Sequence, residues 1–266
     1  MEVDLTGPAE TMLATLYLRA VDAGLPDSVL RDRWAAAAVE RLDYDFDRFR
    51  RLRANSSSVT LRARALDDWT RDAIRPGIVV LHLGCGLDSR FERIEPPESV
   101  EWYDIDLPEV IALRRKLFED GAHRHTVASS VTDLALLEQI PGDRPVLMVA
   151  EGLTMYLPAV EGIALLRRIV AHFPSGELIF DAFSRLGVKL SNRLNPPVVS
   201  SGSHLEWGID DPERIAAQVP GLTLISEQRF DQLDLRAAPL PVRLTLRLTT
   251  RLPIVRRLSR MLHYRF

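Results

Sequence analysis

Apolar runs of strand length alternate with stretches of helical periodicity over the middle of the chain. The runs predict five strands, at residues 78–83, 100–105, 125–128, 145–150 and 177–180. Strands that are apolar at successive positions are typical of a parallel sheet, which is buried on both faces. Between these runs, apolar positions three and four residues apart predict helices, of which the clearest covers residues 159–173. This alternation predicts an α/β fold, a Rossmann-like doubly wound sheet with right-handed crossovers.

The first 75 residues contain no comparable strand pattern. Residues 11–21 place their apolar side chains on one helical face, and residues 59–74 form another helical stretch. Asp27 or Ser28 is in position to cap a helix between them, running through residues 35–39. Pro76-Gly77 then breaks the chain before the first strand. We therefore expect residues 1–75 to form an N-terminal helical cap over the sheet.

The C-terminal part of the chain changes pattern. Residues 222–227 and 242–248 predict the last two strands, and the second alternates apolar with polar residues, as a half-exposed antiparallel strand does. A basic amphipathic tail follows at residues 251–266, for which we predict a docked surface helix rather than a membrane-binding segment. The sheet is thus expected to be mostly parallel, with an antiparallel last strand. We predict one domain of 266 residues, with its core at residues 76–250.

Composition excludes several classes of protein. A formal net charge of −3 argues against a general nucleic-acid-binding protein. The single cysteine, Cys85, allows no internal disulfide framework, and we expect no metal site. The chain shows neither a basic leader nor an apolar run of transmembrane length. We therefore expect a cytoplasmic protein.

A glycine turn directly follows the first predicted strand. Gly84 and Gly86 come after the run that ends at Leu83, and Ser89 with Glu92 resembles a capping box that would start a helix near Asp88 or Ser89. Such a turn at the carboxyl end of a strand is where open α/β sheets bind nucleotides. The pattern fits a dinucleotide or S-adenosylmethionine (SAM) equally well, and a plain structural turn is the alternative. Ser89 at the third glycine position disfavours the dinucleotide.

Two acidic residues stand at the ends of later strands. Asp106, 22 residues after Gly84, is placed to accept the ribose hydroxyls of an adenosine ligand, although it is also placed to cap a helix. Asp104 is the competing acid on the same strand. Glu151 follows the apolar run 146–150, where it would attract a sulfonium or ammonium group, unless it is an ordinary loop charge.

Three motifs in order make the pattern specific. Residues 83–90 (LGCGLDSR), 102–110 (WYDIDLPEV) and 150–157 (AEGLTMYL) resemble the signatures of the leucine carboxyl methyltransferase-like family. Residues 16–20 (LYLRA) and 62–68 (RARALDD) are further similar to its bacterial branch, the tetracenomycin-type polyketide O-methyltransferases. The resemblance implies a class I SAM-dependent methyltransferase fold.

The resemblance also implies roles for individual residues. Arg62 would hold the methionine carboxylate of SAM, Gly84 would admit the methionine moiety to the backbone, and Asp106 would bind the ribose. Glu151 would lie near the amino or sulfonium end. The family usually has an aspartate and a leucine at the adenine site, where this chain has Ser129 and Ser130. Either serine is a candidate for the adenine contact.

The methyl acceptor is less defined by the sequence. We expect a small-molecule acceptor, a natural product such as a polyketide, methylated at a carboxyl or hydroxyl oxygen. Tyr156, His204 and Trp207 are candidates to face it, although Tyr156 also fits a pocket wall and His204 an ordinary loop histidine. Arg19 is a further candidate for orienting an acidic acceptor. The alternatives are a protein C-terminal carboxyl methyltransferase, a nicotinamide-dependent dehydrogenase and a SAM-binding module without activity.

Overall fold

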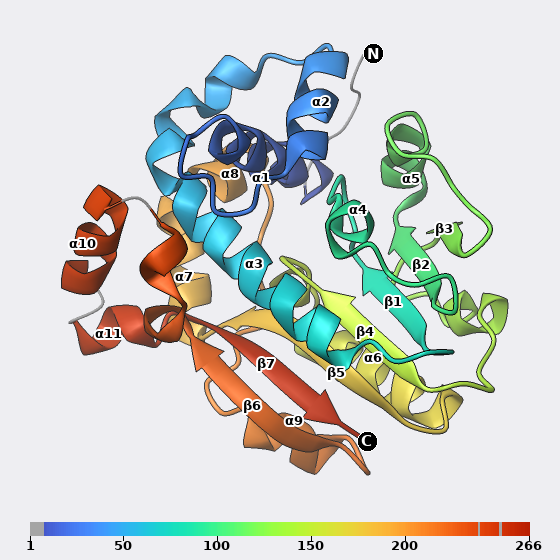
Figure 1. Cartoon of the computed structure of the whole chain (residues 1–266). Coiled ribbons are helices and arrows are strands. Elements are labelled where there is room, and N and C mark those ends of the chain that lie inside the picture. Colours follow the sequence, from blue (N-terminus) through green and yellow to red (C-terminus); the bar gives the residue numbers. More distant parts are fainter. Residues whose placement is uncertain (1–7, 239, 250–251) are drawn as a thin grey trace.

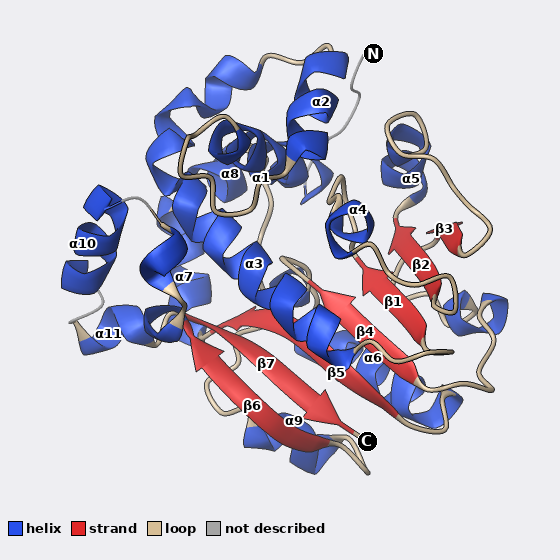
Figure 2. Cartoon of the chain, viewed as in Figure 1, coloured by secondary structure: helices blue, strands red, loops and turns tan. Residues whose placement is uncertain are grey.

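A mixed seven-stranded sheet lies at the centre of the computed structural model, which describes residues 8–238, 240–249 and 252–266 (Figures 1 and 2). Its strands, in the order in which they lie side by side, are β3 (Arg124–Ala128), β2 (Glu101–Asp106), β1 (Val79–Leu83), β4 (Val146–Ala150), β5 (Gly176–Phe183), β7 (Ser259–Arg265) and β6 (Thr223–Arg229). Strands β1 to β5 run parallel, and β7 is antiparallel to both of its neighbours. The predicted fold class is confirmed.

Helices cover both faces of this sheet (Figure 2). The α-helices are α1 (Pro8–Ala23), α2 (Arg33–Arg41), α3 (Ser56–Ala73), α4 (Arg90–Ile94), α5 (Pro108–Arg114), α6 (Ala159–His172), α7 (Arg185–Leu194), α8 (Pro196–Ser200), α9 (Glu213–Gln218), α10 (Leu240–Thr249) and α11 (Pro253–Arg256). Short 3₁₀ segments are η1 (Phe46–Asn55), η2 (Leu136–Gln139), η3 (Thr154–Tyr156), η4 (Phe230–Gln232) and η5 (Leu235–Ala237). None of the described helices has both the length and the apolarity that a membrane span requires.

The central strands bring the predicted site residues to one edge of the sheet. Every residue of β1 and β4 is buried, as expected for strands covered on both faces. In the register of the sheet, Leu83 pairs with Ile105 on one side and with Ala150 on the other. The residues that come next, Gly84, Asp106 and Glu151, therefore meet at the carboxyl edge.

The predicted helical cap lies over this edge. Helix α3 packs on the sheet through Leu61 and Leu66, and α1 packs on α2 and η1 in a separate apolar cluster. The predicted cap of the second helix is wrong. Asp32 caps α2 by accepting from the Ala35 N–H at 2.9 Å, whereas the Ser28 hydroxyl donates to Asp22 at 2.7 Å.

The capping box predicted at the glycine turn is also wrong. Ser89 precedes α4 as expected, but its hydroxyl donates to Asp32 at 2.6 Å instead of capping the helix. Glu92 instead pairs with Arg124 on β3, at 2.6 Å. Tertiary ion pairs and hydrogen bonds outweigh the local capping motif at this position.

The strand predicted at residues 242–248 is a helix, α10. Leu240, Leu244 and Leu248 are four residues apart, so the same leucine-rich run also fits a helical period. Leucine and arginine favour helices, and Pro241 is tolerated in the first turn. The alternation of apolar and polar residues was therefore ambiguous.

The surface helix predicted for the tail is wrong over residues 259–265, which form β7 in the interior of the sheet. The basic side chains of this strand are matched by acids on its two neighbours. Arg260 lies 3.0 Å from Glu227 on β6, and His263 lies 2.6 Å from Glu177 on β5. Part of the predicted tail thus belongs to the sheet, and the predicted end of the core at residue 250 is too early.

Candidate active site

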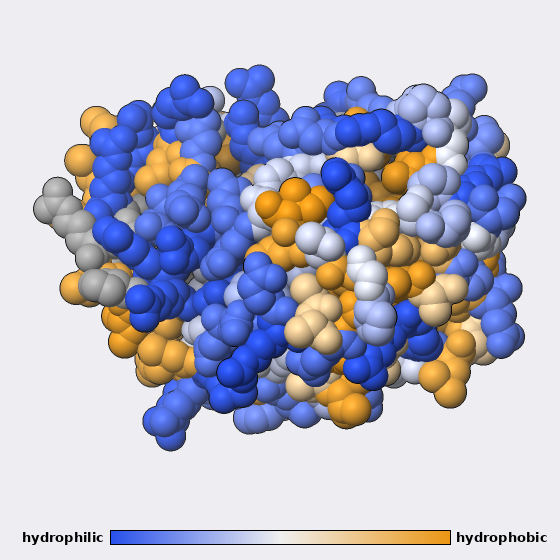
Figure 3. Space-filling view, turned by 90° about the horizontal axis from the view of Figure 1, so that it is seen from below, coloured by the Kyte–Doolittle hydropathy of each residue, from blue (hydrophilic) through white to orange (hydrophobic). Residues whose placement is uncertain are grey.

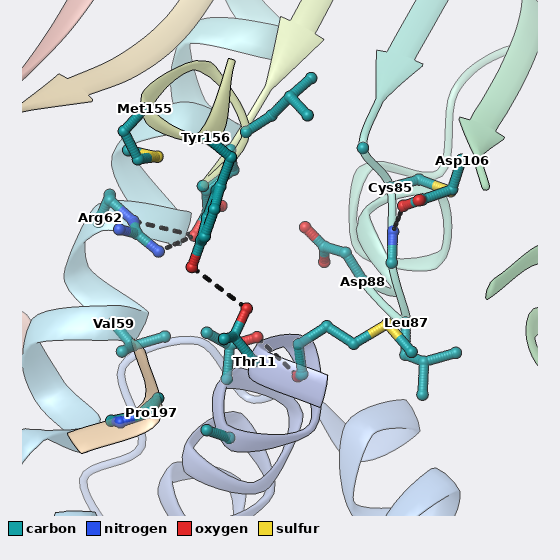
Figure 4. Close-up of a pocket in the computed structure, with 18 of the residues that line it drawn as sticks. Thr11, Val59, Arg62, Cys85, Leu87, Asp88, Asp106, Met155, Tyr156 and Pro197 are labelled. Atoms are coloured by element: carbon teal, nitrogen blue, oxygen red, sulfur yellow. Dashed lines mark hydrogen bonds and ion pairs between the residues drawn. The ribbon is translucent and has the colours of Figure 1, made fainter. Parts of the chain in front are cut away.

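A cavity of about 550 Å³ opens at the carboxyl edge of the sheet, beneath the helical cap (Figure 4). Its walls come from the glycine turn after β1, from the ends of β2, β3 and β4, and from α1, α3 and α8. Each predicted cofactor residue lines this cavity: Arg62, Gly84, Asp106, Ser129, Ser130 and Glu151. Residues from separate parts of the sequence are thus brought together in one place.

The glycine turn presents backbone to the cavity. Gly84 and Gly86 have φ values of +60° and +49°, in the left-handed region that glycine adopts without strain. A Cβ atom on Gly84 would lie 3.0 Å from the Leu153 side chain, so there is little room for a larger residue. Both glycines line the cavity, so the backbone of the turn is accessible to a ligand there.

Asp106 is held rigidly beside this turn. Its Oδ2 accepts from the Gly86 N–H and its Oδ1 from the Leu107 N–H, each at 2.7 Å (Figure 4). Burial raises the pKa of Asp106, although the two backbone donors oppose that shift. A carboxylate offers about four acceptor positions, so two remain for ribose hydroxyls. Asp106 does not cap α5, because the N-cap residue of that helix is Leu107 and no side chain caps it.

Asp104, the competing acid, points elsewhere. Its side chain is fully buried, with Arg114 at 2.8 Å, His82 at 2.8 Å and Arg124 at 3.1 Å. Although burial alone would raise the pKa of Asp104, these cationic and hydrogen-bonding partners hold it far below its usual range. Asp104 therefore stabilises the sheet beneath the turn instead of lining the cavity.

Ser129 and Ser130 follow β3 and form the cavity wall next to Asp106. The Ser129 N–H donates to the Asp106 carbonyl oxygen at 2.9 Å. The Ser129 hydroxyl is 3.3 Å from Asp133, and the Ser130 hydroxyl is 2.8 Å from that of Thr132. Both side chains have local polar partners, and the geometry does not choose between the two serines.

Glu151 and Arg62 lie at the centre of a buried charged network. Arg62 Nη2 lies 3.0 Å from Glu151 Oε1, and Arg90 Nη2 lies 2.5 Å from Glu151 Oε2. Burial opposes the ionisation of Glu151, but Arg62, Arg90 and Arg19 outweigh it and lower its pKa. Glu151 is therefore a buried carboxylate that stays ionised, and it is not a solvated loop charge.

The charged network extends under the cap. It is a connected set of ion pairs that comprises four arginines and five acids: Arg19, Arg62, Arg90, Arg93, Asp32, Asp67, Asp88, Glu151 and Asp181. Arg19 reaches from α1 to Asp88 in the glycine turn at 3.0 Å, so the cap is tied directly to the turn that lines the cavity. Counted formally, five carboxylates against four guanidinium groups leave one excess negative charge, although burial raises the pKa of Asp181.

The three residues predicted to face the methyl acceptor lie in different surroundings. Tyr156 lines the cavity, and its hydroxyl is 3.2 Å from the Thr11 hydroxyl of α1 (Figure 4). Trp207 packs in the sheet's apolar core, directly over Gly162, and His204 is exposed. Trp207 and His204 are not among the residues that line the cavity, so of the three candidates only Tyr156 lies at the cavity.

Sequence reasoning missed Asp181 and gave Asp88 no role beyond starting a helix. Asp181 Oδ2 lies 3.1 Å from Arg62 Nη1, and its Oδ1 accepts from the Gly152 N–H at 2.6 Å. Asp181 follows the apolar run 178–180, just as Glu151 follows the run 146–150. That shared pattern of an acid after a buried strand was the available signal.

A sequence profile of the leucine carboxyl methyltransferase family matches residues 13–170 of this chain. The chain belongs to this family. Over 234 residues it is 41% identical to the tetracenomycin polyketide synthesis O-methyltransferase TcmP of Streptomyces glaucescens, covering 87% of this chain and 86% of that protein. It is also 39% identical to the S-adenosyl-L-methionine-dependent methyltransferase dpfgK of Gibberella zeae, covering 83% and 82% of the two chains.

The fold agrees with this assignment. The crystal structure of an S-adenosylmethionine-dependent methyltransferase from Mesorhizobium loti superposes with a TM-score of 0.54 at 14% identity, covering 77% of this chain and 98% of that one. The protein is therefore a methyltransferase that uses SAM, as the three sequence motifs predicted.

Proposed function

We propose that this methyltransferase transfers the methyl group of SAM to a carboxyl or hydroxyl oxygen of a small natural product, such as a polyketide. The observation that carries the proposal is a single cavity in which the cofactor residues meet a largely apolar chamber. The name of the relative TcmP, a polyketide synthesis O-methyltransferase, supports the acceptor class. The acidic net charge fits a small-molecule acceptor better than a nucleic acid. We also propose a cytoplasmic location for the enzyme.

The cofactor residues fit SAM in both shape and charge. Asp106 would hold the ribose, Ser129 or Ser130 the adenine, and the backbone at Gly84 the methionine moiety. Arg62 would bind the carboxylate, since a guanidinium matches it with paired donors. SAM carries one more positive than negative charge at neutral pH, and the formal charge of the network has the opposite sign. SAM supplies the electrophilic methyl group.

The acceptor side of the cavity is largely apolar. Val59, Met155 and Pro197 lie on this side, together with Tyr156 and Thr11 (Figure 4). A flat, mostly apolar molecule would bury its surface against these side chains. An apolar wall with a few polar groups is typical of small-molecule sites.

Three carboxylates that line the cavity, Asp88, Asp106 and Glu151, are assigned to the cofactor side, and the other titratable side chains in its lining are poor general bases. Among the described residues that line the cavity, Tyr156 has its pKa raised by burial, and the buried Cys85 thiol has its pKa raised well above its usual range. Burial lowers the pKa of His82, which is also bonded to Asp104 at 2.8 Å. A base near neutral pKa is what an alcohol or phenol acceptor would need. The chamber therefore favours an acceptor that arrives ionised, and a carboxylate meets this condition at neutral pH.

Catalysis then depends on alignment. Methyl transfer is an in-line displacement, and holding the two reacting atoms in line is worth up to about 7–11 kcal/mol in well-oriented systems. The cap ties α1 to the glycine turn through Arg19 and Asp88, at 3.0 Å. That closure would fix the acceptor against the cofactor and exclude water.

Incubation of the enzyme with methyl-labelled SAM and a cell extract tests the acceptor class. The proposal predicts label in an organic-soluble small product, and alkaline hydrolysis that releases the label would identify a carboxyl ester. Label in protein would instead indicate a protein carboxyl methyltransferase. Tight SAM binding with no labelled product from extracts rich in polyketides would favour a binding module without activity.

A further inference from the structure

The connection between β6 and β7 exposes a row of leucines. We call residues 240–249 and 252–258 the C-terminal arm; it contains α10 and α11 and lies at the periphery of the molecule (Figure 1). Leu240, Leu244 and Leu248 are 63%, 52% and 60% exposed and, at a spacing of four residues, share one face of α10. Leu252 and Ile254 continue the apolar surface, at 57% and 53% exposure.

This leucine row faces away from the body of the protein. Val242, on a different side of α10, packs against the apolar cluster between the sheet and α3. The helix is thus attached through one side while the leucine row remains open to solvent. Apolar side chains gather at the same edge of the molecule in a view from below (Figure 3). Exposed apolar surface of this kind usually marks a binding surface.

The charge of this region is strongly segregated. Residues 240–258 contain five arginines and no aspartate or glutamate, although the whole chain has a net charge of −3. Arg247 and Arg257 are exposed on the arm, and Arg243 is half-buried. Arg256 is paired with Asp231 at 3.5 Å, so it contributes less to the surface charge. The arm therefore offers leucines and unbalanced positive charge together.

We propose that the C-terminal arm docks on an anionic lipid surface, which reverses the expectation drawn from the sequence of the tail alone. The leucine row would enter the boundary between the headgroups and the acyl chains, while the arginines meet the lipid phosphates; this is how interfacial amphipathic helices bind. The helix would lie in the plane of the surface, since α10 has only ten residues. A second copy of the chain is a poorer occupant, because two such arms would bring arginines of like charge together.

The segment that carries the arm is flanked in sequence by two residues of the cavity wall. Phe230, just after β6, and Ser259, at the start of β7, both line the cavity, and the arm lies between them in sequence. An arm docked on lipid would hold this part of the cavity wall near the membrane, from which an apolar acceptor could enter. That consequence, unlike the docking itself, rests on the proposed function.

Vesicle sedimentation of the full-length protein tests the proposal. With phosphatidylcholine vesicles containing about 30% phosphatidylglycerol we expect binding that salt releases, and binding at least about tenfold weaker to phosphatidylcholine alone. Leu244→Ser with Leu248→Ser should weaken binding to the anionic vesicles at least about tenfold. Arg247→Ala with Arg257→Ala should do the same. Leu134→Ser, at a leucine that is 78% exposed on the loop before η2, is the matched control and should bind like wild type.

Two results would overturn the proposal. One is wild-type protein that stays in the supernatant with anionic vesicles, or that binds them no better than neutral ones. The other is a dimer, measured by light scattering, that the two leucine substitutions dissociate, because a second copy would then cover the row. SAM binding by each variant, measured in parallel, shows that it is folded and keeps the proposed function separate from the docking.

Discussion

Arg62 on α3 and Asp181 near the carboxyl end of β5 form a buried ion pair, with 3.1 Å between Nη1 and Oδ2. The other side of the guanidinium meets Glu151 through Nε at 3.1 Å and Nη2 at 3.0 Å. These contacts engage only part of a group that has five N–H donors. The Arg62 side chain is still 20% exposed at the cavity, so donors remain for a ligand carboxylate.

Asp181→Asn should weaken SAM binding by about tenfold, the change expected for about 1.4 kcal/mol. The neutral amide would no longer anchor Arg62, and the guanidinium would hold the methionine carboxylate less firmly. Decarboxylated SAM, which lacks that carboxylate, provides the control in the same calorimetric titration. Its affinity should be equal for the variant and wild type, whereas a general distortion of the cavity would weaken both ligands.

Gly84→Ala should both destabilise the fold and impair SAM binding. An alanine at φ +60° costs about 1–2 kcal/mol, and its methyl group would press on Leu153 beside the cofactor. Gly77→Ala is the matched control, because Gly77 has a φ of +79° with nothing within 4 Å of an added Cβ. Thermal unfolding should show a loss of stability in both variants from the positive φ, and a larger loss in Gly84→Ala because of the contact with Leu153. Equal SAM affinity in both variants would contradict the role given to Gly84.

Asp104→Asn should destabilise the protein by about 3–5 kcal/mol at neutral pH, because it leaves Arg114 buried without its charge partner. The folded-state pKa of Asp104 is depressed, so its stabilising effect is present above the unfolded pKa of about 4 and is lost as the pH falls below it. Chemical denaturation should therefore show a constant difference in the free energy of unfolding between wild type and variant above about pH 5. This difference should become smaller in acid. A difference in unfolding free energy that grows in acid would contradict the stabilising role of ionised Asp104.

The substitution Tyr156→Phe tests whether Tyr156 only lines the cavity or also acts as a catalytic residue. Burial raises the pKa of Tyr156, so its hydroxyl stays protonated at neutral pH and is a poor base. We expect kcat to fall by less than about tenfold, through loss of the hydrogen bond to Thr11, whereas loss of a general base costs about 10²–10⁴-fold. A drop of that larger size in steady-state kinetics would make Tyr156 a catalytic residue.

The sequence predicted the sheet from β1 to β5 and the residues at its carboxyl edge because both follow local rules. Apolar runs define the strands, and glycines or acids directly after them define the edge, as at Gly84 and Glu151. Apart from the ambiguous run at 242–248, the errors arose where distant partners decide the structure. Arg260 and His263 suit a buried strand only because Glu227 and Glu177 lie beside them, and Ser89 bonds to Asp32 instead of capping its own helix.

The acceptor side was poorly predicted for the same reason. Trp207 and His204 stood out by residue type, but only the fold shows that one fills the core and the other faces solvent. Asp181 is placed at the site by its ion pair with Arg62, which is more than a hundred residues away in the sequence. A network of buried ion pairs leaves no periodic signal.

The assignment of the cofactor side is tested most directly by calorimetric titration of SAM into wild type, Asp106→Ala and Glu151→Gln. We predict one bound SAM per wild-type chain and a loss of affinity of at least about tenfold in each variant. Wild-type protein that binds no SAM, or variants that bind it as tightly as wild type, would contradict the account.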